Sequence, residues 1–134
     1  MSRENVEIVK AVFAAWQERN PRAALEHIDP DIEVDFTGHS GGNLSRIDVV
    51  RGTEGLQGML SDWLADFESL EFHPQSFIDA GESVIVWLRT TARGRKSGVP
   101  VEDVFAVVYT LRDGRIVRFR GYETLADATS DLGI

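Results

Sequence analysis

Three long runs of alternating apolar and polar residues in the second half of the chain restrict the fold more than any other feature of the sequence. They cover residues 83–93, 101–111 and 115–123, and turns separate them. A period of two is typical of strands, and Asp113-Gly114 is a strong signal for a tight hairpin. The sequence therefore predicts three long strands joined as an antiparallel meander.

The first half of the chain has a helical period instead. Apolar side chains recur every three or four residues over 4–19, Pro21 suits the first turn of a short second helix, and a third helix follows Thr53. Residues 32–36 alternate like a half-buried strand, and 37–51 form a long loop of the kind that often lines a binding site. These elements predict the α+β class, with helices against one face of the sheet.

Two segments complete the expected fold. Residues 70–78 form a further strand that Pro74 weakens. The polar tail 125–134 either forms a last helical turn or covers a sheet edge.

Alternation also sorts the meander into two faces. Val84, Val86 and Leu88 belong inside, against the helices. The opposite set is rich in the residue types that protein–protein interfaces favour, so we expect a homodimer through the outer face of the sheet. The residues expected in that contact are Trp87, Arg89, Arg118, Arg120 and Tyr122. A sheet face that is only solvated is the alternative.

The same alternation assigns several other side chains of the meander to one face or the other. Ile116 shares the face of the arginines, and Tyr109 is assigned outward. Glu102 and Asp103 take opposite faces unless a bulge exchanges them.

Composition excludes several classes of function. The 134 residues make one domain, 1–134, and contain no cysteine, which removes disulfides and thiolate catalysis. A net charge of -8 disfavours contact with nucleic acid. No apolar run reaches the length of a membrane span, and no basic start precedes an apolar run at the N-terminus, so we expect a cytoplasmic protein without a membrane contact.

Motifs for metals and cofactors are missing from the sequence as well. His27, His39 and His73 lack the spacing of metal ligands, and the glycines do not form a phosphate-binding motif before a helix. We therefore expect neither a metal nor a bound cofactor.

Several short stretches in a characteristic order span nearly the whole chain. They are Phe13-Ala14-Ala15-Trp16, Asp29-Pro30-Asp31-Ile32-Glu33-Val34, Arg51-Gly52-Thr53-Glu54-Gly55-Leu56, Ile78-Asp79-Ala80-Gly81-Glu82 and Leu111-Arg112-Asp113-Gly114-Arg115. Together they resemble the nuclear transport factor 2-like superfamily and, within it, the SnoaL-like proteins. The resemblance implies a single SnoaL-like domain, in which a cone-shaped, curved, mixed or antiparallel sheet is wrapped by three helices of the N-terminal half (a cystatin-like α+β barrel). It also implies an apolar cavity at the open end of the cone and, in many members, a homodimer.

The resemblance leaves the reaction open, because this superfamily contains steroid isomerases, epoxide hydrolases, polyketide cyclases and non-catalytic modules. It places the aspartate base of the steroid isomerases on Phe36 or, with a slip of one residue, on Asp35. Their tyrosine falls near Val12 and their second acid on Ala106, while the acid of the hydrolases and cyclases falls on Gly121. Alternation points Asp35 away from the cavity, so none of these positions is expected to move a proton there, and the sequence favours neither steroid isomerisation by that mechanism nor the chemistry of the hydrolases and cyclases.

Two interpretations follow and remain open. One is a pocket protein that binds a small apolar or cyclic organic compound. The other is an isomerase-, cyclase- or hydrolase-type enzyme that uses His39 and Glu123 for proton transfer, with Asp35 or Asp103 in reserve. The residues expected to form the apolar wall are Trp16, Phe36, Met59, Trp63 and Phe119.

Overall fold

In a computed structural model of the chain, residues 2–35 and 49–134 are described. Their elements in chain order are α1 (Ser2–Gln17), α2 (Pro21–Leu25), β1 (Ile28–Asp35), β2 (Val49–Arg51), α3 (Gly52–Asp66), β3 (Phe67–Ala80), β4 (Ser83–Gly94), β5 (Pro100–Arg112), β6 (Arg115–Tyr122) and α4 (Leu125–Leu132). The predicted helices and the three strands of the meander are confirmed, with shifts of a few residues at their ends.

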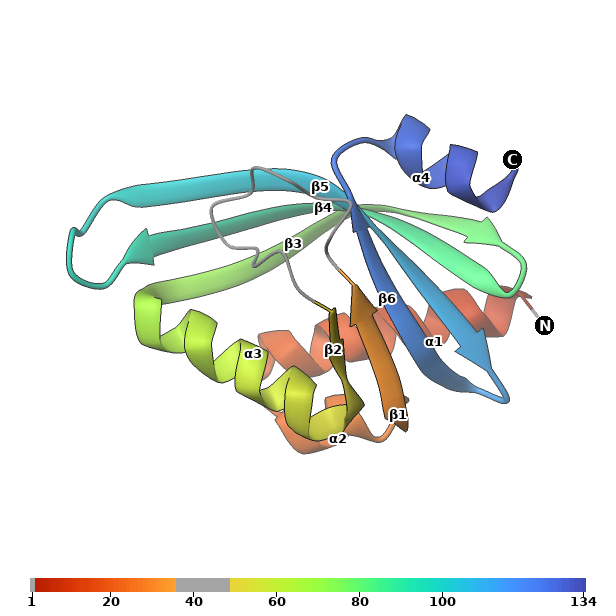
Figure 1. The fold of residues 1–134 in the computed structure, drawn as a ribbon, viewed down its shortest axis with the longest axis horizontal. Coiled ribbons are helices and arrows are strands. Elements are labelled where there is room, and N and C mark those ends of the chain that lie inside the picture. The colour runs from red at the N-terminus through yellow and green to blue at the C-terminus, as the bar shows by residue number, and fades with distance from the viewer. Residues whose placement is uncertain (1, 36–48) are drawn as a thin grey trace.

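The strands form one curved sheet with the order β2-β1-β6-β5-β4-β3 (Figure 1). β1 pairs with β6 in parallel, whereas the other neighbours are antiparallel, so the sheet is mixed. The predicted α+β class and the curved sheet are confirmed. Within the described residues β2 and β3 remain as edges, and the sheet does not close into a barrel.

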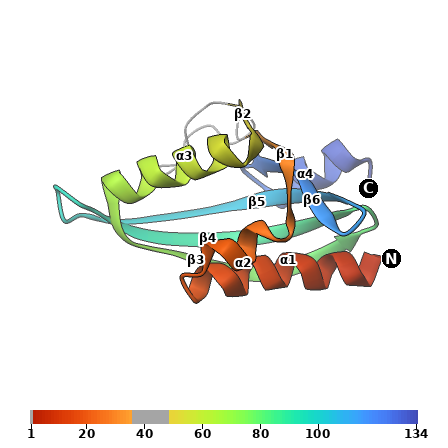
Figure 2. The same cartoon turned by 90° about the horizontal axis from the view of Figure 1, so that it is seen from below.

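The two long helices lie against one face of this sheet, which we call the inner face. α1 packs against β3 and β4, and α3 packs against β1 and β2. Figure 2 shows both helices running alongside the long strands. The main hydrophobic core fills the space between them and the sheet, and its fully buried members include Val9, Ile32, Val34, Val84, Val86 and Ile116. Burial of these apolar side chains is the main force that holds the layers together.

The C-terminal tail folds against the opposite side of the sheet, the outer face. α4 begins at Thr124, whose side chain accepts a hydrogen bond of 3.0 Å from the amide of Asp127, and ends at Gly133 in the left-handed region. Ala128 of α4 is completely buried in a second, smaller core with Ile85, Ala106 and Val108. The tail is therefore a two-turn helix on a sheet face, and not the single turn or edge cover that the sequence predicts. Figure 1 shows it apart from the other three helices.

A β-bulge in the hairpin between β5 and β6 overturns part of the predicted assignment of faces. Leu111 pairs with Ile116, but Thr110 pairs with Arg118 and Tyr109 with Phe119, so Val117 is an extra residue. Because each residue of a strand points to the face opposite its neighbour's, one extra residue reverses the parity on its far side. Ile116 therefore points to the inner face, and Tyr109 points there as well because it pairs with Val84 and Phe119. Both are buried, and the outward assignment of these two residues is wrong.

No such shift occurs between β4 and β5. Their register is continuous from Ser83 with Thr110 to Arg93 with Pro100. Glu102 consequently lies on the outer face, where its carboxylate pairs with the guanidinium of Arg89 at 3.1 Å. Asp103 lies on the inner face beside Thr90.

Among the described residues, no helix is both long enough and apolar enough to cross a membrane.

Candidate functional site

A cavity of about 60 Å³ lies between α1, α3 and the inner face of the sheet. Its described lining consists almost wholly of apolar and aromatic side chains. These are Val12, Phe13, Trp16, Ile28, Leu56, Met59, Leu60, Trp63, Phe72, Leu88, Phe105, Val107, Tyr109 and Phe119. The helical period of α1 and α3 and the alternation of β3–β6 bring these residues together, because each element turns its apolar side toward the same space.

Aromatic rings form two groups in this lining. Phe72 lies between the two tryptophans, with its ring centroid 6.5 Å from that of Trp16 and 6.4 Å from that of Trp63. Tyr109 meets Phe13 at 5.9 Å and Phe119 at 4.8 Å, both nearly edge to face. These separations are those of favourable aromatic pairs, so the rings hold one another in defined positions.

Tyr109 carries the only hydroxyl group in the described lining. Its side chain is only 6% exposed, and burial raises the pKa of the phenol well above its ordinary value. The group is therefore uncharged at neutral pH. Sequence reasoning assigned Tyr109 outward, whereas its pairing with Val84 of β4 and Phe119 of β6 places it on the inner face.

A larger groove of about 560 Å³ adjoins the cavity along the start of β3. Trp16, Leu60 and Phe72 line both spaces and so separate them. The rest of the groove is more polar, and its described lining includes Gln17, Arg19, Gln57, Ser61, Glu71 and His73. The Nε2 atom of His73 lies 2.9 Å from the hydroxyl of Thr91 and 3.8 Å from the carboxylate of Glu71.

The residues predicted for the site fall into three groups. The structure places Trp16, Met59, Trp63 and Phe119 in the lining of the cavity. Phe36 and His39 lie outside the described residues, so the structure does not bear on them. Glu123 is exposed, follows the last residue of β6, and belongs to the described lining of neither space.

The two reserve acids lie apart from each other. Asp35 is on the outer face of β1, with a carboxylate oxygen 3.6 Å from Nε of Arg120, as its parity predicts. Asp103 is on the inner face, yet the described lining of the cavity does not include it. The structure therefore does not bring Glu123, Asp35 and Asp103 together at the cavity.

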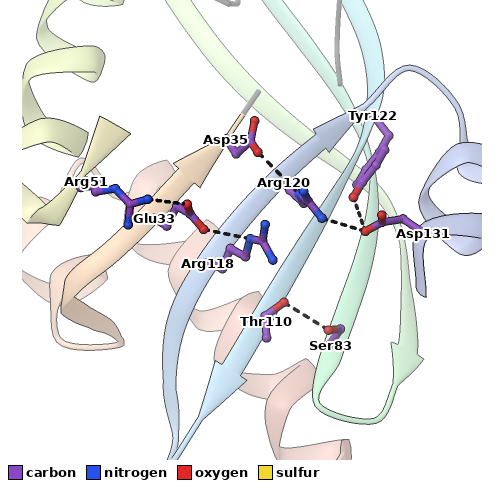
Figure 3. Close-up of polar contacts among 9 residues, drawn as sticks. All are labelled: Glu33, Asp35, Arg51, Ser83, Thr110, Arg118, Arg120, Tyr122 and Asp131. Carbon is purple, nitrogen blue, oxygen red and sulfur yellow. Dashed lines mark hydrogen bonds and ion pairs between the residues drawn. The ribbon is translucent and has the colours of Figure 1, made fainter. Parts of the chain in front are cut away.

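The arginines of the outer face take part in ion pairs within the chain (Figure 3). Glu33 of β1 lies between two of them, because its carboxylate is 3.1 Å from Arg51 of β2 and 3.1 Å from Arg118 of β6. These pairs join three neighbouring strands across the outer face. Exposed pairs of this kind contribute little stability singly, about 0–1 kcal/mol.

A second group of polar contacts attaches α4 to the sheet. Asp131 of α4 accepts hydrogen bonds from Arg120 at 3.0 Å and from the hydroxyl of Tyr122 at 2.5 Å (Figure 3). Burial, together with the hydrogen bond to Asp131, raises the pKa of Tyr122 to about 12. Trp87 packs against the small core beneath the same helix. The residues predicted for a homodimer thus lie on the outer face, where α4 contacts some of them.

No group of three or more His, Asp or Glu side chains within residues 2–35 and 49–134 is arranged to hold a metal ion.

The curved mixed sheet, with helices enclosing an apolar cavity on its inner face, defines the chain as a cone-shaped α+β protein. The chain belongs to the SnoaL-like domain family, whose model matches residues 9–119. Among curated proteins, none matches the sequence.

Solved structures share this fold over nearly their full length. TerC, co-crystallised with polyporic acid, is 20% identical, with a TM-score of 0.76 over 98% of this chain and 99% of that one. An NTF2-like protein from Burkholderia xenovorans LB400 is 28% identical, with a TM-score of 0.72 over 95% and 96%. A protein from Jannaschia sp. CCS1, provisionally named a SnoaL-like polyketide cyclase, is 23% identical, with a TM-score of 0.75 over 97% and 92%. At these identities the first and third show likeness of fold alone.

Proposed function

We propose that this protein binds a small apolar or cyclic organic compound in the cavity between α1, α3 and the inner face of the sheet. The observation that carries the proposal is the lining, in which apolar and aromatic side chains from both helices and five strands converge on one space. Small-molecule sites in proteins are typically concave, apolar and supplied with few polar groups.

Two relatives of the same fold support this choice of ligand class. TerC was crystallised with polyporic acid, and the Jannaschia protein carries the name of a polyketide cyclase. Both names connect the fold with small organic compounds.

The size of the cavity adds a condition to the proposal. About 60 Å³ is well below the roughly 300–1,000 Å³ of typical ligand pockets, whereas the adjoining groove of about 560 Å³ lies within that range. A cyclic compound therefore extends from the cavity into the groove, past Trp16, Leu60 and Phe72. Outward rotation of these three side chains would join the two spaces.

Thermal-shift measurements with a panel of steroids, terpenoids and aromatic polyketides test this function, because a ligand of the native state raises the melting temperature. We expect at least one class to stabilise the wild-type protein. Met59→Trp, which fills the cavity, should abolish that shift. Ala65→Trp on the exposed side of α3 is the matched control and should retain it. Circular dichroism shows whether each variant is folded, and an equal shift in the Met59→Trp variant would place the ligand elsewhere.

The second candidate, an enzyme that uses His39 and Glu123, has weaker support. Tyr109 is the only titratable side chain in the described lining, and a phenol of raised pKa is a poor proton carrier at neutral pH. We therefore expect His39→Ala and Glu123→Gln to leave ligand binding unchanged. Loss of binding, or of turnover of a bound compound, in either variant would favour the enzyme.

We also propose a homodimer through the outer face of the sheet. Val104 on the outer face of β5 is 37% exposed, and the exposed pair Arg89 and Glu102 adjoins it. Sedimentation equilibrium of the wild-type protein and of Val104→Asp tests this assembly. A monomeric wild type would contradict the proposal.

A further inference from the structure

Three side chains separate the cavity from the groove, and each of them lies on a different element. Trp16 belongs to α1, Leu60 to α3 and Phe72 to β3, and all three line both spaces. A cavity that holds a single benzene ring measures about 150 Å³. The cavity of about 60 Å³ is too small for a cyclic compound, so part of this boundary has to move when such a ligand enters.

Phe72 has the least regular backbone of the three. Among the described residues β3 pairs only with β4, and the register of this pairing shifts just before Glu71 and again just after Pro74. Phe72 thus lies on a short piece of edge strand between two irregularities. Trp16 and Leu60 lie on helices, whose backbone hydrogen bonds are internal to each helix. The backbone of Phe72 therefore yields most easily.

The ring of Phe72 has a favourable position beside the cavity and space to leave it. Its centroid lies 6.5 Å from that of Trp16 and 6.4 Å from that of Trp63. These are the separations of favourable aromatic pairs, so the position that closes the cavity is the more stable one. The groove of about 560 Å³, which Phe72 also lines, has room for a phenyl ring. An outward rotation of Phe72 therefore needs no displacement of either helix.

A buried hydroxyl group beside Phe72 points to the same place. Thr90 of β4 is the cross-strand partner of Phe72 and is completely buried. Its hydroxyl has no hydrogen-bond partner in the part of the chain that the structure describes. Buried hydroxyl groups are nearly always paired, and one without a partner calls for an explanation. Outward rotation of Phe72 would uncover this hydroxyl to water.

We propose that Phe72 is the gate between the cavity and the groove: it rotates outward with its short piece of β3, uncovers the hydroxyl of Thr90, and so determines the entry of compounds larger than the cavity. This assignment rests on the proposed function of the cavity and names the residue that controls entry to it. An unpaired buried hydroxyl destabilises the closed position relative to the open one, so Thr90 favours opening.

Naphthalene and xenon test the gate, because naphthalene is larger than the cavity, whereas xenon is a single atom of the kind that enters apolar cavities. Entry is followed at the indole resonance of Trp63, which lines the cavity and not the groove. A minor open state is populated at roughly 0.1–10%, so permanent opening in Phe72→Ala should raise the association rate constant of naphthalene about tenfold or more.

Phe77→Ala is the matched control for this measurement. Phe77 is a half-buried ring of the same strand and belongs to the described lining of neither space. Naphthalene should therefore enter Phe77→Ala at the wild-type rate, and xenon should shift the Trp63 resonance equally in both proteins.

Thr90→Val tests the second observation with a side chain of the same shape. Loss of the unpaired hydroxyl should raise the melting temperature. Loss of the group that becomes hydrated in the open position should slow the entry of naphthalene about fivefold, the factor that corresponds to one hydrogen bond of about 1 kcal/mol. If Thr90→Val is more stable but naphthalene enters at the wild-type rate, the hydroxyl stays buried during opening, and its assigned role is wrong.

The outcomes separate the gate from the function on which it rests. If neither xenon nor naphthalene shifts the Trp63 resonance in the wild type or in Phe72→Ala, the cavity binds no ligand, and the proposed function fails together with the gate. If naphthalene enters the wild type as fast as it enters Phe72→Ala, or if Phe77→Ala accelerates its entry equally, the cavity binds ligands but Phe72 is not the gate. Entry of xenon alone into both proteins would also show that Phe72 does not connect the two spaces.

Discussion

The two faces of the sheet differ in the surroundings of their polar side chains, and the two tyrosines of the chain show this difference most clearly. On the outer face, Tyr122 donates to Asp131, and the arginines are paired with carboxylates of the same chain. On the inner face, Tyr109 packs edge to face against Phe13 and Phe119 and lines the apolar cavity. The outer face holds charged side chains in ion pairs within the chain, whereas the inner face places one neutral hydroxyl beside an apolar cavity.

The largest expected effect tests the β-bulge at Val117, which decides the face of the sheet to which Ile116 points. Ile116 is completely buried on the inner face, so Ile116→Ala should lower the free energy of unfolding by about 2–5 kcal/mol. Val117→Ala, at the half-buried extra residue, should cost less than about 1.5 kcal/mol. Urea unfolding measures both. If Ile116→Ala cost no more than Val117→Ala, Ile116 would share the face of the arginines, and the bulge would be absent.

The next effect concerns the cover of the outer face. Ala128→Glu places a carboxylate in the small core beneath α4, where Ala128 is completely buried, and should cost about 1–3 kcal/mol or detach the helix. Hydrogen exchange of the α4 amides distinguishes these two results. Ala126→Glu, exposed on the same helix, is the control and should leave the exchange rates unchanged. Equal protection in both variants would show that α4 does not depend on this contact.

Alkaline pH should affect the two tyrosines through their raised pKa values. A phenol whose pKa is higher in the folded state contributes stability that is complete below its unfolded pKa, near 10, and is lost as the pH rises through the folded pKa. For the buried Tyr109, the slope above pH 10 should approach about 1.4 kcal/mol per pH unit. Unfolding measured from pH 8 to 11 should show this decline in the wild type and a smaller one in Tyr109→Phe. Absorbance at 295 nm reports phenolate directly, and full ionisation of both tyrosines near pH 10 in the native protein would contradict the assigned burial.

The smallest effect is expected at the polar contact between α4 and the sheet. Asp131→Asn removes the charge that pairs with Arg120 and accepts from Tyr122, and it should lower stability by about 1 kcal/mol or less, because the group is exposed. The pKa of Tyr122 should fall from about 12 toward its ordinary value. Measurement at low and high salt is the control, because screening should reduce the difference in stability. An unchanged pKa of Tyr122 would show that Asp131 does not accept its hydroxyl in solution.

Local patterns in the sequence were sufficient to predict most of the fold. The helical spacing over 4–19, the alternation of the meander and Asp113-Gly114 each predict an element that the structure contains. They also identify Trp16, Met59, Trp63 and Phe119 as apolar residues turned inward. These predictions succeed because the apolar period of a helix or strand and its burial have the same cause.

Only the tertiary structure decided to which face of the sheet Tyr109 and Ile116 point and where α4 packs. One extra residue at Val117 reverses the parity of β6 without any change in its apolar pattern, so simple alternation from the arginines points Ile116 to the wrong side. The tail is polar enough to suit an exposed turn, and only the apolar surface of Ile85, Ala106 and Val108 shows where it packs. By itself, the sequence determined which segments form helices and strands and most of their buried sides. Pairing between distant strands determined which hydroxyl faces the cavity, because register depends on contacts that no local pattern records.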